Sequence, residues 1–242
     1  MRQWSSNTWE AAMFSAKGIR SGYSGVTVIK DLDLNVEDEI FAVLGANGAG
    51  KTTLLATLAR LIPLMTGEMT FEDQDITKAH PWDTAALGLG YVPQEKGIFA
   101  DLTVLENLQI GSMIGDRPRQ ERIDEIVELF PDIGKRQAQL AGTLSGGESR
   151  MVACGRALMQ DPKMLLLDEP TAGLSPLYVD TFFEKIKEIH ETRDVSIILA
   201  EQNATKALEI SDRVMVLSLG EASEVLNASD LTTEQLKKGY RI

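Results

Sequence analysis

Cysteine is almost absent from this sequence, since Cys154 is the only one in 242 residues. A single thiol cannot form an internal disulfide and no signal peptide is visible, so we expect a protein of a reducing, cytoplasmic compartment. Cys154 lies in a predicted helix among apolar residues, which favours a buried core thiol over a nucleophile.

Long hydrophobic runs are also missing. The longest apolar stretches, such as residues 164–167 and 197–200, are far shorter than the roughly 20 residues that cross a bilayer. We therefore expect no part of the chain to span a membrane. Hydrophobic residues nevertheless make up 43% of the chain and charged residues 25%, which excludes disorder and indicates one large α/β domain, or one domain with a smaller lobe.

Positive charge is scarce. The chain has 24 Lys and Arg against 36 Asp and Glu, and its net charge is −12. Proteins that bind nucleic acid as their main role normally carry a basic stripe, so we expect no nucleic-acid partner and a solvated acidic surface. The only two histidines, His80 and His190, have no cysteine or acidic cluster at metal-ligand spacing and are interpreted as structural or surface residues.

A phosphate-binding motif follows the apolar run at residues 40–44. Residues 45–52 read GANGAGKT and fit the pattern G-x-x-x-x-G-K-[ST] at every fixed position. The glycines allow backbone N–H groups to surround a phosphate, Lys51 can reach the β and γ oxygens, and Thr52 can offer its hydroxyl to Mg²⁺. The residues that we expect to contact ATP here are Gly45, Asn47, Gly48, Gly50, Lys51, Thr52 and Thr53.

The remaining pattern predicts strands and helices in alternation, as in a parallel sheet. Residues 1–12 show no periodicity and are interpreted as a disordered extension or as the result of an upstream start. Strands are predicted at residues 14–20, 26–29, 40–44, 68–71, 89–92, 164–167 and 195–200, a helix at residues 52–60, a helical lobe at about residues 95–160, and a short antiparallel tail at residues 213–217 and 222–226.

Two adjacent carboxylates follow a second buried strand. The segment MLLLDEP places Asp168 at the end of an apolar run and Glu169 directly after it. At the carboxyl end of an inner strand, Asp168 can hold Mg²⁺ directly or through water. Glu169 is then well placed to polarise an attacking water as a general base. The alternative, a carboxylate that only caps a helix, is less favoured.

With these motifs in view, the chain resembles the ATPases of the ABC transporter family. Leu144-Ser145-Gly146-Gly147-Glu148 looks like the signature motif of that family. The resemblance covers residues 13–242 and implies an ABC cassette: a P-loop NTPase core with a mainly parallel sheet, an antiparallel β subdomain and an inserted α-helical lobe. It also implies that two cassettes bind two ATP molecules between them, with Ser145, Gly146 and Gly147 contacting the nucleotide held by the partner.

Further roles follow from the resemblance. Tyr23 resembles the aromatic residue that stacks on adenine, and Gln94 resembles the glutamine that touches Mg²⁺ while coupling to a membrane permease subunit. Gln202 stands where the commonest pattern has a switch histidine. A neutral amide can hydrogen-bond the γ-phosphate but carries no charge, so either hydrolysis is impaired and the protein is an ATP-gated clamp, or Gln202 positions the γ-phosphate while Glu169 is the base.

We favour the second interpretation, because the segment from Ala200 to Ala204, AEQNA, is similar to the importers of branched-chain amino acids and related amides. In that branch, homodimers and heterodimers of cassettes act with permeases at the cytoplasmic face of the membrane, and indirectly with a solute-binding protein. Ser149-Arg150 is less typical of the branch, and Glu148 and Ser175 also differ from the commonest family pattern. The rival hypothesis is a soluble ABC ATPase with no role in transport.

Overall fold

The computed structural model describes residues 12–95, 97–114, 117–232 and 234–236. The predicted N-terminal extension, residues 1–12, lies outside these residues except for Ala12. The strands are β1 (Phe14–Tyr23), β2 (Val26–Val36), β3 (Ile40–Leu44), β4 (Leu64–Phe71), β5 (Gln74–Asp75), β6 (Leu89–Val92), β7 (Met164–Asp168), β8 (Ser196–Glu201), β9 (Arg213–Ser218), β10 (Glu221–Ala222) and β11 (Leu226–Asn227). The helices are α1 (Lys51–Leu58), α2 (Pro81–Ala86), α3 (Val104–Gly111), α4 (Arg119–Leu129), α5 (Pro131–Gly134), α6 (Gly146–Leu158), α7 (Pro176–Arg193) and α8 (Ala204–Ile210), with short 3₁₀ turns at Ala141–Thr143 and Ala228–Asp230.

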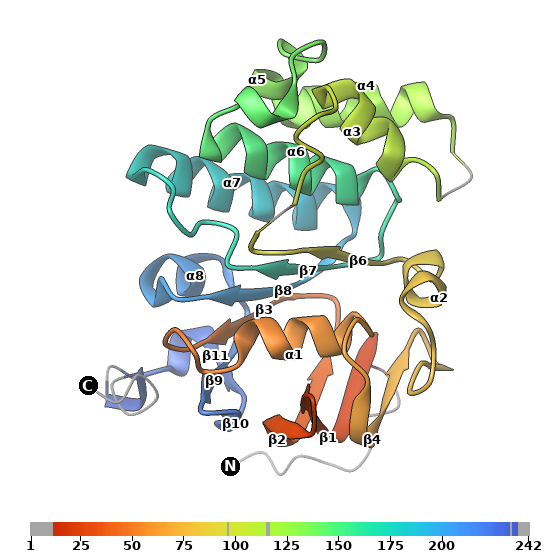
Figure 1. The fold of residues 1–242 in the computed structure, drawn as a ribbon. Helices are drawn as coiled ribbons and strands as arrows, with labels where there is room; N and C mark the ends of the chain where they lie inside the picture. The colour runs from red at the N-terminus through yellow and green to blue at the C-terminus, as the bar shows by residue number, and fades with distance from the viewer. Residues whose placement is uncertain (1–11, 96, 115–116, 233, 237–242) are drawn as a thin grey trace.

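A mainly parallel sheet runs through the middle of the molecule (Figure 1). Its strand order is β10-β9-β3-β8-β7-β6, with β11 also paired to β9. The pairs β6–β7, β7–β8, β8–β3 and β3–β9 are all parallel. Because these strands are parallel, the loops after β3 and β7 leave the sheet at a common carboxyl edge, which is where ligands bind in such folds.

Both faces of this sheet are buried, and successive residues alternate between them. In β3, Ile40, Ala42 and Leu44 belong to the core that the upper helices cover, whereas Phe41 and Val43 belong to the core on the opposite side. Side chains of a strand point alternately to the two faces, so a strand covered on both faces reads as a continuous apolar run. This explains why the central strands could be predicted from short hydrophobic stretches.

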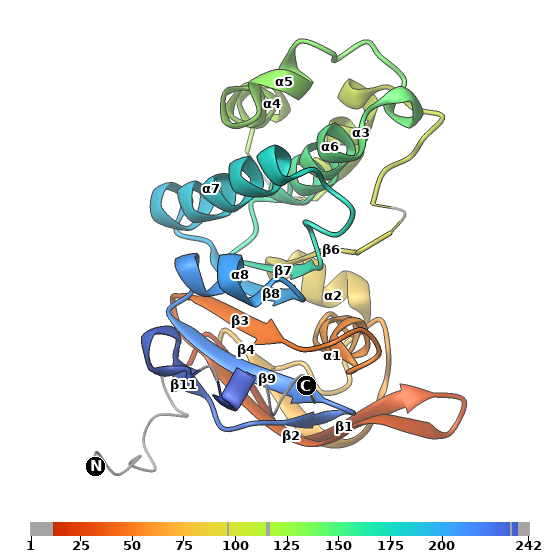
Figure 2. The same ribbon diagram turned by 90° about the vertical axis from the view of Figure 1, so that its left-hand side faces the viewer.

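The lower core is closed by α1 and by a second sheet. The antiparallel sheet has the order β2-β1-β4-β5, and α1 lies between it and the central sheet in both ribbon views (Figures 1 and 2). Within β2, residues 30–36 extend the strand beyond the predicted end at residue 29. Asp31 has a positive φ of 48° and lies at a shift in the β1–β2 register, so the charged residues beyond the bulge obscured the strand.

The helices α3, α4, α5 and α6 fall within residues 95–160, where a helical lobe was expected. Their buried residues form one hydrophobic cluster with α7 and with the upper face of the central sheet. Cys154 on α6 is fully buried in that cluster, as expected for a core thiol, and burial raises its pKa to about 12. Within the part of the chain that the structure describes, no helix is long and apolar enough to span a bilayer.

The predicted antiparallel tail is only partly correct. β9 pairs antiparallel with β10 and β11, but it also lies parallel to β3 as a full member of the central sheet. Residues 223–225, expected to be part of a strand, form none. The error arose because a hairpin signal around Gly220 is local, whereas the parallel partner β3 is far away in the sequence. The arrangement expected for the whole fold, a mainly parallel sheet with an antiparallel sheet and added helices, is otherwise confirmed.

Candidate nucleotide site

The predicted phosphate loop joins β3 to α1 at the carboxyl edge of the central sheet. Gly48 and Gly50 have φ angles of 78° and 109°, a region that other residues rarely adopt. Gly50 is the N-cap of α1, and no side chain caps this helix. The first N–H groups of a helix have no acceptor within the helix and carry its positive dipole end. The start of α1 is therefore an open anion site.

Lys51 lies at the start of α1, and its side chain is turned back over the loop. Its ammonium group donates to the carbonyl oxygens of Gly45 at 2.6 Å and Ala46 at 3.1 Å, and it forms an ion pair of 2.9 Å with Glu169 Oε1. The Lys51 side chain is only 3% exposed. A buried cation in this position is held ready for a phosphate, which competes with Glu169 for the same ammonium.

Asp168 ends β7 and is almost completely buried. Thr52 Oγ1 donates to Asp168 Oδ1 at 3.2 Å, and the Tyr91 hydroxyl lies 3.4 Å from the other carboxylate oxygen. Burial raises the pKa of Asp168, and the neighbouring charge of Glu169 adds to the increase, whereas the hydrogen bond from Thr52 opposes it. The positive charge of Lys51 also favours the ionised form of Asp168, and a bound cation would stabilise that form further.

Glu169 has a positive φ of 44°, a strained conformation for a residue other than glycine. Its N–H donates to Ala200 O at 2.9 Å, which ties the strained residue to β8. Its two carboxylate oxygens have different partners: Oε1 pairs with Lys51, and Oε2 accepts a hydrogen bond of 3.1 Å from Gln94 Nε2. The two contacts fix the carboxylate at the phosphate loop.

A cavity of about 300 Å³ lies over this arrangement. It is lined by Val28, Asn47, Gly48, Gly50, Lys51, Thr52, Thr53, Gln94 and Glu169. The structure thus brings together most of the loop residues predicted to bind ATP, together with Gln94 and Glu169, while Gly45 and Asp168 lie beneath them through their contacts with Lys51 and Thr52. Residues from four separate segments of the sequence meet at one hollow.

The predicted signature residues lie elsewhere, at the start of α6. Ser145 is the N-cap of this helix and accepts a hydrogen bond from the Glu148 N–H at 3.3 Å. A β-carbon on Gly147 would lie 2.4 Å from the Tyr178 ring, so only glycine fits there. None of the three signature residues lines the phosphate-loop cavity, although Gly146 borders a separate cavity of about 240 Å³ next to Gln94.

Tyr23 and Gln202 also lie outside the residues that line the phosphate-loop cavity. Tyr23 ends β1 and is 51% exposed, which leaves its ring accessible to a flat ligand. Gln202 follows β8, the neighbour of β3 and β7, and is exposed at the carboxyl edge of the sheet. The structure therefore does not bring these two predicted site residues into the lining of the phosphate-loop cavity.

Two residues of this edge were not identified from the sequence as site residues. Tyr91 reaches Asp168 from β6, the strand beside β7. Glu201 is buried at the end of β8, and its Oε1 accepts from both the N–H and the hydroxyl of Thr171, at 3.1 and 2.6 Å. Its Oε2 accepts from the Gln202 N–H at 3.1 Å. A carboxylate directly after an apolar strand was the available signal for Glu201.

The donor set at the site suits a hard cation such as Mg²⁺. Asp168 and Thr52, which are hydrogen-bonded to each other, can supply oxygen ligands. Gln94 is hydrogen-bonded to Glu169, the residue next to Asp168. Among the described residues there is no group of three or more histidine, cysteine or carboxylate side chains able to hold a metal by themselves. Mg²⁺ typically takes one or two protein ligands and completes its shell with water and phosphate oxygens, so the residues present fit this ion.

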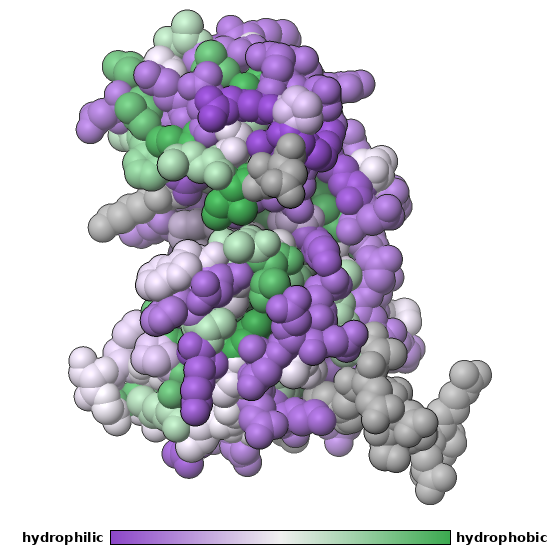
Figure 3. Space-filling view, turned by 90° about the vertical axis from the view of Figure 1, so that its right-hand side faces the viewer, coloured by the Kyte–Doolittle hydropathy of each residue, from purple (hydrophilic) through white to green (hydrophobic). Residues whose placement is uncertain are grey.

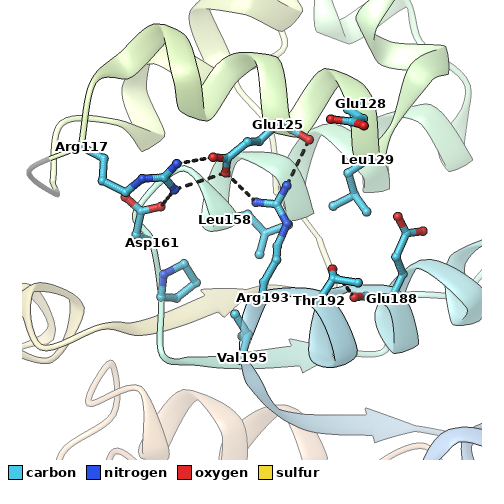
Figure 4. Close-up of a pocket in the computed structure, with 11 residues that line it drawn as sticks. Arg117, Glu125, Glu128, Leu129, Leu158, Asp161, Glu188, Thr192, Arg193 and Val195 are labelled. Carbon is cyan, nitrogen blue, oxygen red and sulfur yellow. Dashed lines mark hydrogen bonds and ion pairs between the residues drawn. The ribbon is translucent and has the colours of Figure 1, made fainter.

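Another cavity lies away from the phosphate loop, between the helices of the upper part of the molecule and the connections beside them. It measures about 620 Å³ and is lined by residues of α4, α7 and the connections beside them. Glu125 lies between Arg117 and Arg193 and forms ion pairs with both (Figure 4). Arg117 also pairs with Asp161 at 2.9 Å. Both arginines are thus paired, and this network joins α4 to the end of α7.

The side of the molecule drawn in Figure 3 is mainly hydrophilic. Its surface is indented between the helical upper part and the lower part, and hydrophobic side chains show at the indentation. The cavity that contains the Glu125 network also has apolar residues in its lining, namely Leu129, Leu158 and Val195.

A phosphate loop with its lysine, facing a carboxylate pair at the end of a neighbouring parallel strand, defines a nucleotide triphosphatase. The sequence profile of the ABC transporter family matches residues 29–172. The chain belongs to the ABC transporter family, as an ATP-hydrolysing subunit.

Relatives support this assignment along nearly the whole chain. The protein is 37% identical to BraG, a high-affinity branched-chain amino acid transport ATP-binding protein of Pseudomonas aeruginosa, over 94% of this chain and 99% of BraG. It is 37% identical to a probable branched-chain amino acid transport ATP-binding protein, LivF, of Archaeoglobus fulgidus, over 88% and 91%. It is also 32% identical to LptB, a lipopolysaccharide export ATP-binding protein of Haemophilus influenzae, over 95% and 97%.

Solved structures show the same fold. A nucleotide-free ATP-binding cassette from an ABC transporter superimposes with a TM-score of 0.80 at 25% identity, covering 94% of both chains. The ADP conformation of the cassette MJ1267 gives a TM-score of 0.77 at 26% identity, again over 94% of both chains. The cassette MJ0796, solved as a dimer in a post-hydrolysis state bound to ADP and Pi, also has this fold, with a TM-score of 0.79 at 22% identity over 89% of this chain and 99% of MJ0796.

Proposed function

We propose that this chain is the ATPase subunit of an importer of branched-chain amino acids or related amides. The observation that carries the proposal is the similarity to BraG and LivF, both named as branched-chain amino acid transport proteins, over nearly the full length of each. Substrate choice is not encoded in the nucleotide site, so the substrate assignment depends on this similarity. The mechanism of ATP handling depends on the site itself.

In the proposed site, the loop N–H groups and Lys51 bind the ATP phosphates, and Tyr23 stacks on adenine. Thr52, Asp168 and Gln94 would hold Mg²⁺, which would supply positive charge to offset that of the β- and γ-phosphates. Gly45, Asn47, Gly48, Gly50 and Thr53 complete the lining of the loop. The phosphate draws the Lys51 ammonium away from Glu169, because both are anions that compete for one buried cation.

Release from Lys51 prepares Glu169 for its role as general base. A carboxylate paired with an ammonium group is a weaker proton acceptor than an unpaired one. Gln94 remains its second partner in the structure and so orients the carboxylate toward the water that attacks the γ-phosphate. Gln202 lies beside Glu201 on the neighbouring strand and is proposed to hydrogen-bond the γ-phosphate in place of the more usual histidine.

The proposed active unit contains a second cassette, identical or homologous. Ser145, Gly146 and Gly147 line no part of the phosphate-loop cavity of their own chain, so we assign them to the nucleotide held by the partner. The pair would act at the cytoplasmic face of the membrane, bound to permease subunits and indirectly to a solute-binding protein. Closing around ATP and opening after hydrolysis would shift the permease between two states through differential contacts.

Lipopolysaccharide export is the second candidate, because LptB aligns with 95% of the chain at 32% identity. To separate the two, the chain would be purified with the membrane subunits encoded beside its gene and reconstituted in proteoliposomes. The proposal predicts that ATP turnover increases with the adjacent solute-binding protein loaded with leucine. Stimulation by lipopolysaccharide instead, or copurification with ribosomes or nucleic acid and no membrane subunit, would refute the importer assignment.

A further inference from the structure

Three segments of the site meet around one small cavity. The cavity of about 240 Å³ is bordered by the loop after β6, the first half of α6 and the turn after Glu169, with the lining residues Gln94, Gly97, Ile98, Gly146, Ser149, Arg150, Ala153, Ala172, Gly173 and Leu174. Gln94 borders this cavity and the phosphate-loop cavity as well. It is therefore the link between the phosphates and the signature helix.

Arg150 makes this link rigid. Its Nη1 donates a hydrogen bond of 3.0 Å to the carbonyl oxygen of Pro93, the residue before Gln94. Gly97 approaches the same helix closely, since a β-carbon there would lie 2.9 Å from the Ala153 side chain. The loop that carries Gln94 is thus held against α6 at two points, one polar and one by close packing.

Arg150 carries its charge in a partly buried position near several carboxylates. Burial lowers the pKa of Arg150, while the carboxylates of Asp168, Glu201, Glu95 and Glu169 act in the opposite direction. A guanidinium remains charged under such conditions. Arg150 therefore supplies a fixed positive charge that faces the carboxylates of the catalytic edge from the signature helix, while its hydrogen bond holds the backbone of the Gln94 loop.

We propose that Arg150 is a positioning residue that couples the two nucleotide sites of the cassette dimer. The path runs from Glu169 to Gln94, through the Pro93 carbonyl to Arg150, and along α6 to Ser145 and Gly147 at its start. Occupancy of the phosphate loop changes the contacts of Gln94 and Glu169, and Arg150 transmits this change to the helix that serves the partner's nucleotide. The inference rests on the proposed pairing of two cassettes.

The test compares Arg150→Gln, Arg150→Lys and the control Arg119→Gln in the assembled transporter. Arg119 is exposed on α4, so its substitution removes one positive charge from the same helical region without removing a site contact. For Arg150→Gln we expect turnover to fall about tenfold, as for the loss of a charged hydrogen bond. The Hill coefficient for ATP should fall from about 2 toward 1, since two coupled sites become independent.

Arg150→Lys can still donate a hydrogen bond to the Pro93 carbonyl, so it should keep most of the cooperativity that Arg150→Gln loses. ATP binding by the isolated Arg150→Gln chain should stay within about twofold of wild type, because Arg150 hydrogen-bonds Pro93 and is not among the residues that line the phosphate-loop cavity. Unchanged turnover and cooperativity in Arg150→Gln would overturn the role of Arg150 and leave the cassette dimer intact. A wild-type complex that hydrolyses ATP without cooperativity would instead overturn the paired-site proposal on which the coupling rests. A loss of folding in both variants would overturn a positioning role in favour of a structural one.

Discussion

Two helix N-termini in this molecule were predicted to bind phosphate, and they differ in one respect. The start of α1 has Gly50 as its N-cap and no side chain that caps it. The start of α6 is closed by a capping box, in which Ser145 accepts from the Glu148 N–H and the Glu148 carboxylate accepts from Ser145. The α1 terminus has no capping side chain, whereas at the α6 terminus the Glu148 N–H and the Ser145 hydroxyl are already hydrogen-bonded within the capping box.

At the α6 terminus an internal carboxylate already accepts from Ser145. Glu148 Oε2 accepts from the Ser145 N–H at 2.9 Å and from the Ser145 hydroxyl at 2.8 Å, while Arg136 Nε lies 2.7 Å from Glu148 Oε1. A phosphate that arrives from a partner subunit must therefore replace a carboxylate for the Ser145 hydroxyl. The open terminus of α1 requires no such exchange, apart from the ion pair between Lys51 and Glu169.

This difference indicates a sequence of events. We therefore expect the α1 terminus to bind ATP in a single chain, and the α6 terminus to bind phosphate only when a partner brings its nucleotide. A carboxylate in a capping box is well suited to this, because it stabilises the helix in the absence of the partner. Four substitutions, at Glu169, Thr52, Ser145 and Glu148, test whether the α1 and α6 termini differ in this way.

The largest effect is expected for Glu169→Gln. Loss of the general base should reduce turnover by about 10²–10⁴-fold. ATP binding by the isolated chain should be retained or become tighter, because Lys51 no longer has a competing carboxylate. Turnover of the complex and equilibrium binding of ATP to the single chain measure the two effects.

The matched control is Glu184→Gln, which changes an exposed carboxylate on α7. Near-normal turnover in Glu169→Gln would show that Glu169 is not the general base.

A matched pair of hydroxyl deletions compares the two termini directly. Thr52→Ala should weaken Mg-ATP binding to the isolated chain by roughly ten- to a hundredfold, because it removes a hydrogen bond to a charged group. Ser145→Ala should leave that affinity unchanged but lower turnover of the complex, and it should destabilise the chain by about 1 kcal/mol through loss of the cap. If Ser145→Ala weakened ATP binding in the single chain as much as Thr52→Ala, the distinction between the termini would be wrong.

The two termini also show what the sequence could predict. The phosphate loop and the Asp168-Glu169 pair were predicted because each is a local pattern after an apolar strand. The capping box at Ser145 and Glu148 is local as well, since both partners lie within one turn. The sequence therefore identified both helix starts, and the spacing of Ser145 and Glu148 also predicts the capping box that the structure shows. It did not reveal the ion pair between Arg136 and Glu148, which joins two separate segments.

Contacts between segments that are distant in the sequence could not be predicted from local patterns. The ion pair of Lys51 with Glu169 and the hydrogen bond of Gln94 to the same carboxylate join three separate strand ends. Glu201 also follows an apolar run, but its role as an acceptor for the N–H and hydroxyl of Thr171 depends on a segment 30 residues away and could not be predicted. Strand order decides these contacts, and only the parallel pairing of β3, β7 and β8 brings them together.

A smaller, pH-dependent effect is expected for Glu148→Gln. Burial acts to raise the pKa of Glu148, but the hydrogen bonds from Ser145 and the charge of Arg136 outweigh it and hold the pKa below the ordinary value of 4.5. A lowered pKa stabilises the folded state above the unfolded pKa, and this contribution is lost as the pH falls. Wild type should therefore exceed Glu148→Gln in stability by about 1 kcal/mol at pH 7.

Chemical denaturation of both chains between pH 7 and pH 3 measures this difference, which should shrink below about pH 4.5. In the complex, the same substitution should lower the ATP concentration for half-maximal turnover, because an amide competes less well than a carboxylate for the Ser145 hydroxyl. A difference that stayed constant down to pH 3 would mean that the Glu148 charge does not stabilise the α6 terminus.

The smallest effect is expected away from both termini, at Glu125 on α4. Its pKa is lowered chiefly by the hydrogen bond from Arg117, opposed by burial and aided by the charges of Arg117 and Arg193. The Glu125 side chain is 35% exposed, so solvent and salt screen these pairs. Glu125→Gln should therefore lower the free energy of unfolding by only about 0.5 kcal/mol at low salt, and most of that loss should disappear near 1 M salt.

Chemical denaturation at two salt concentrations measures this loss, and ATP turnover is a second readout. Unchanged turnover is expected because the network joins α4 to α7 without touching the phosphate loop; a large loss of turnover would instead connect the α4–α7 junction to the catalytic edge.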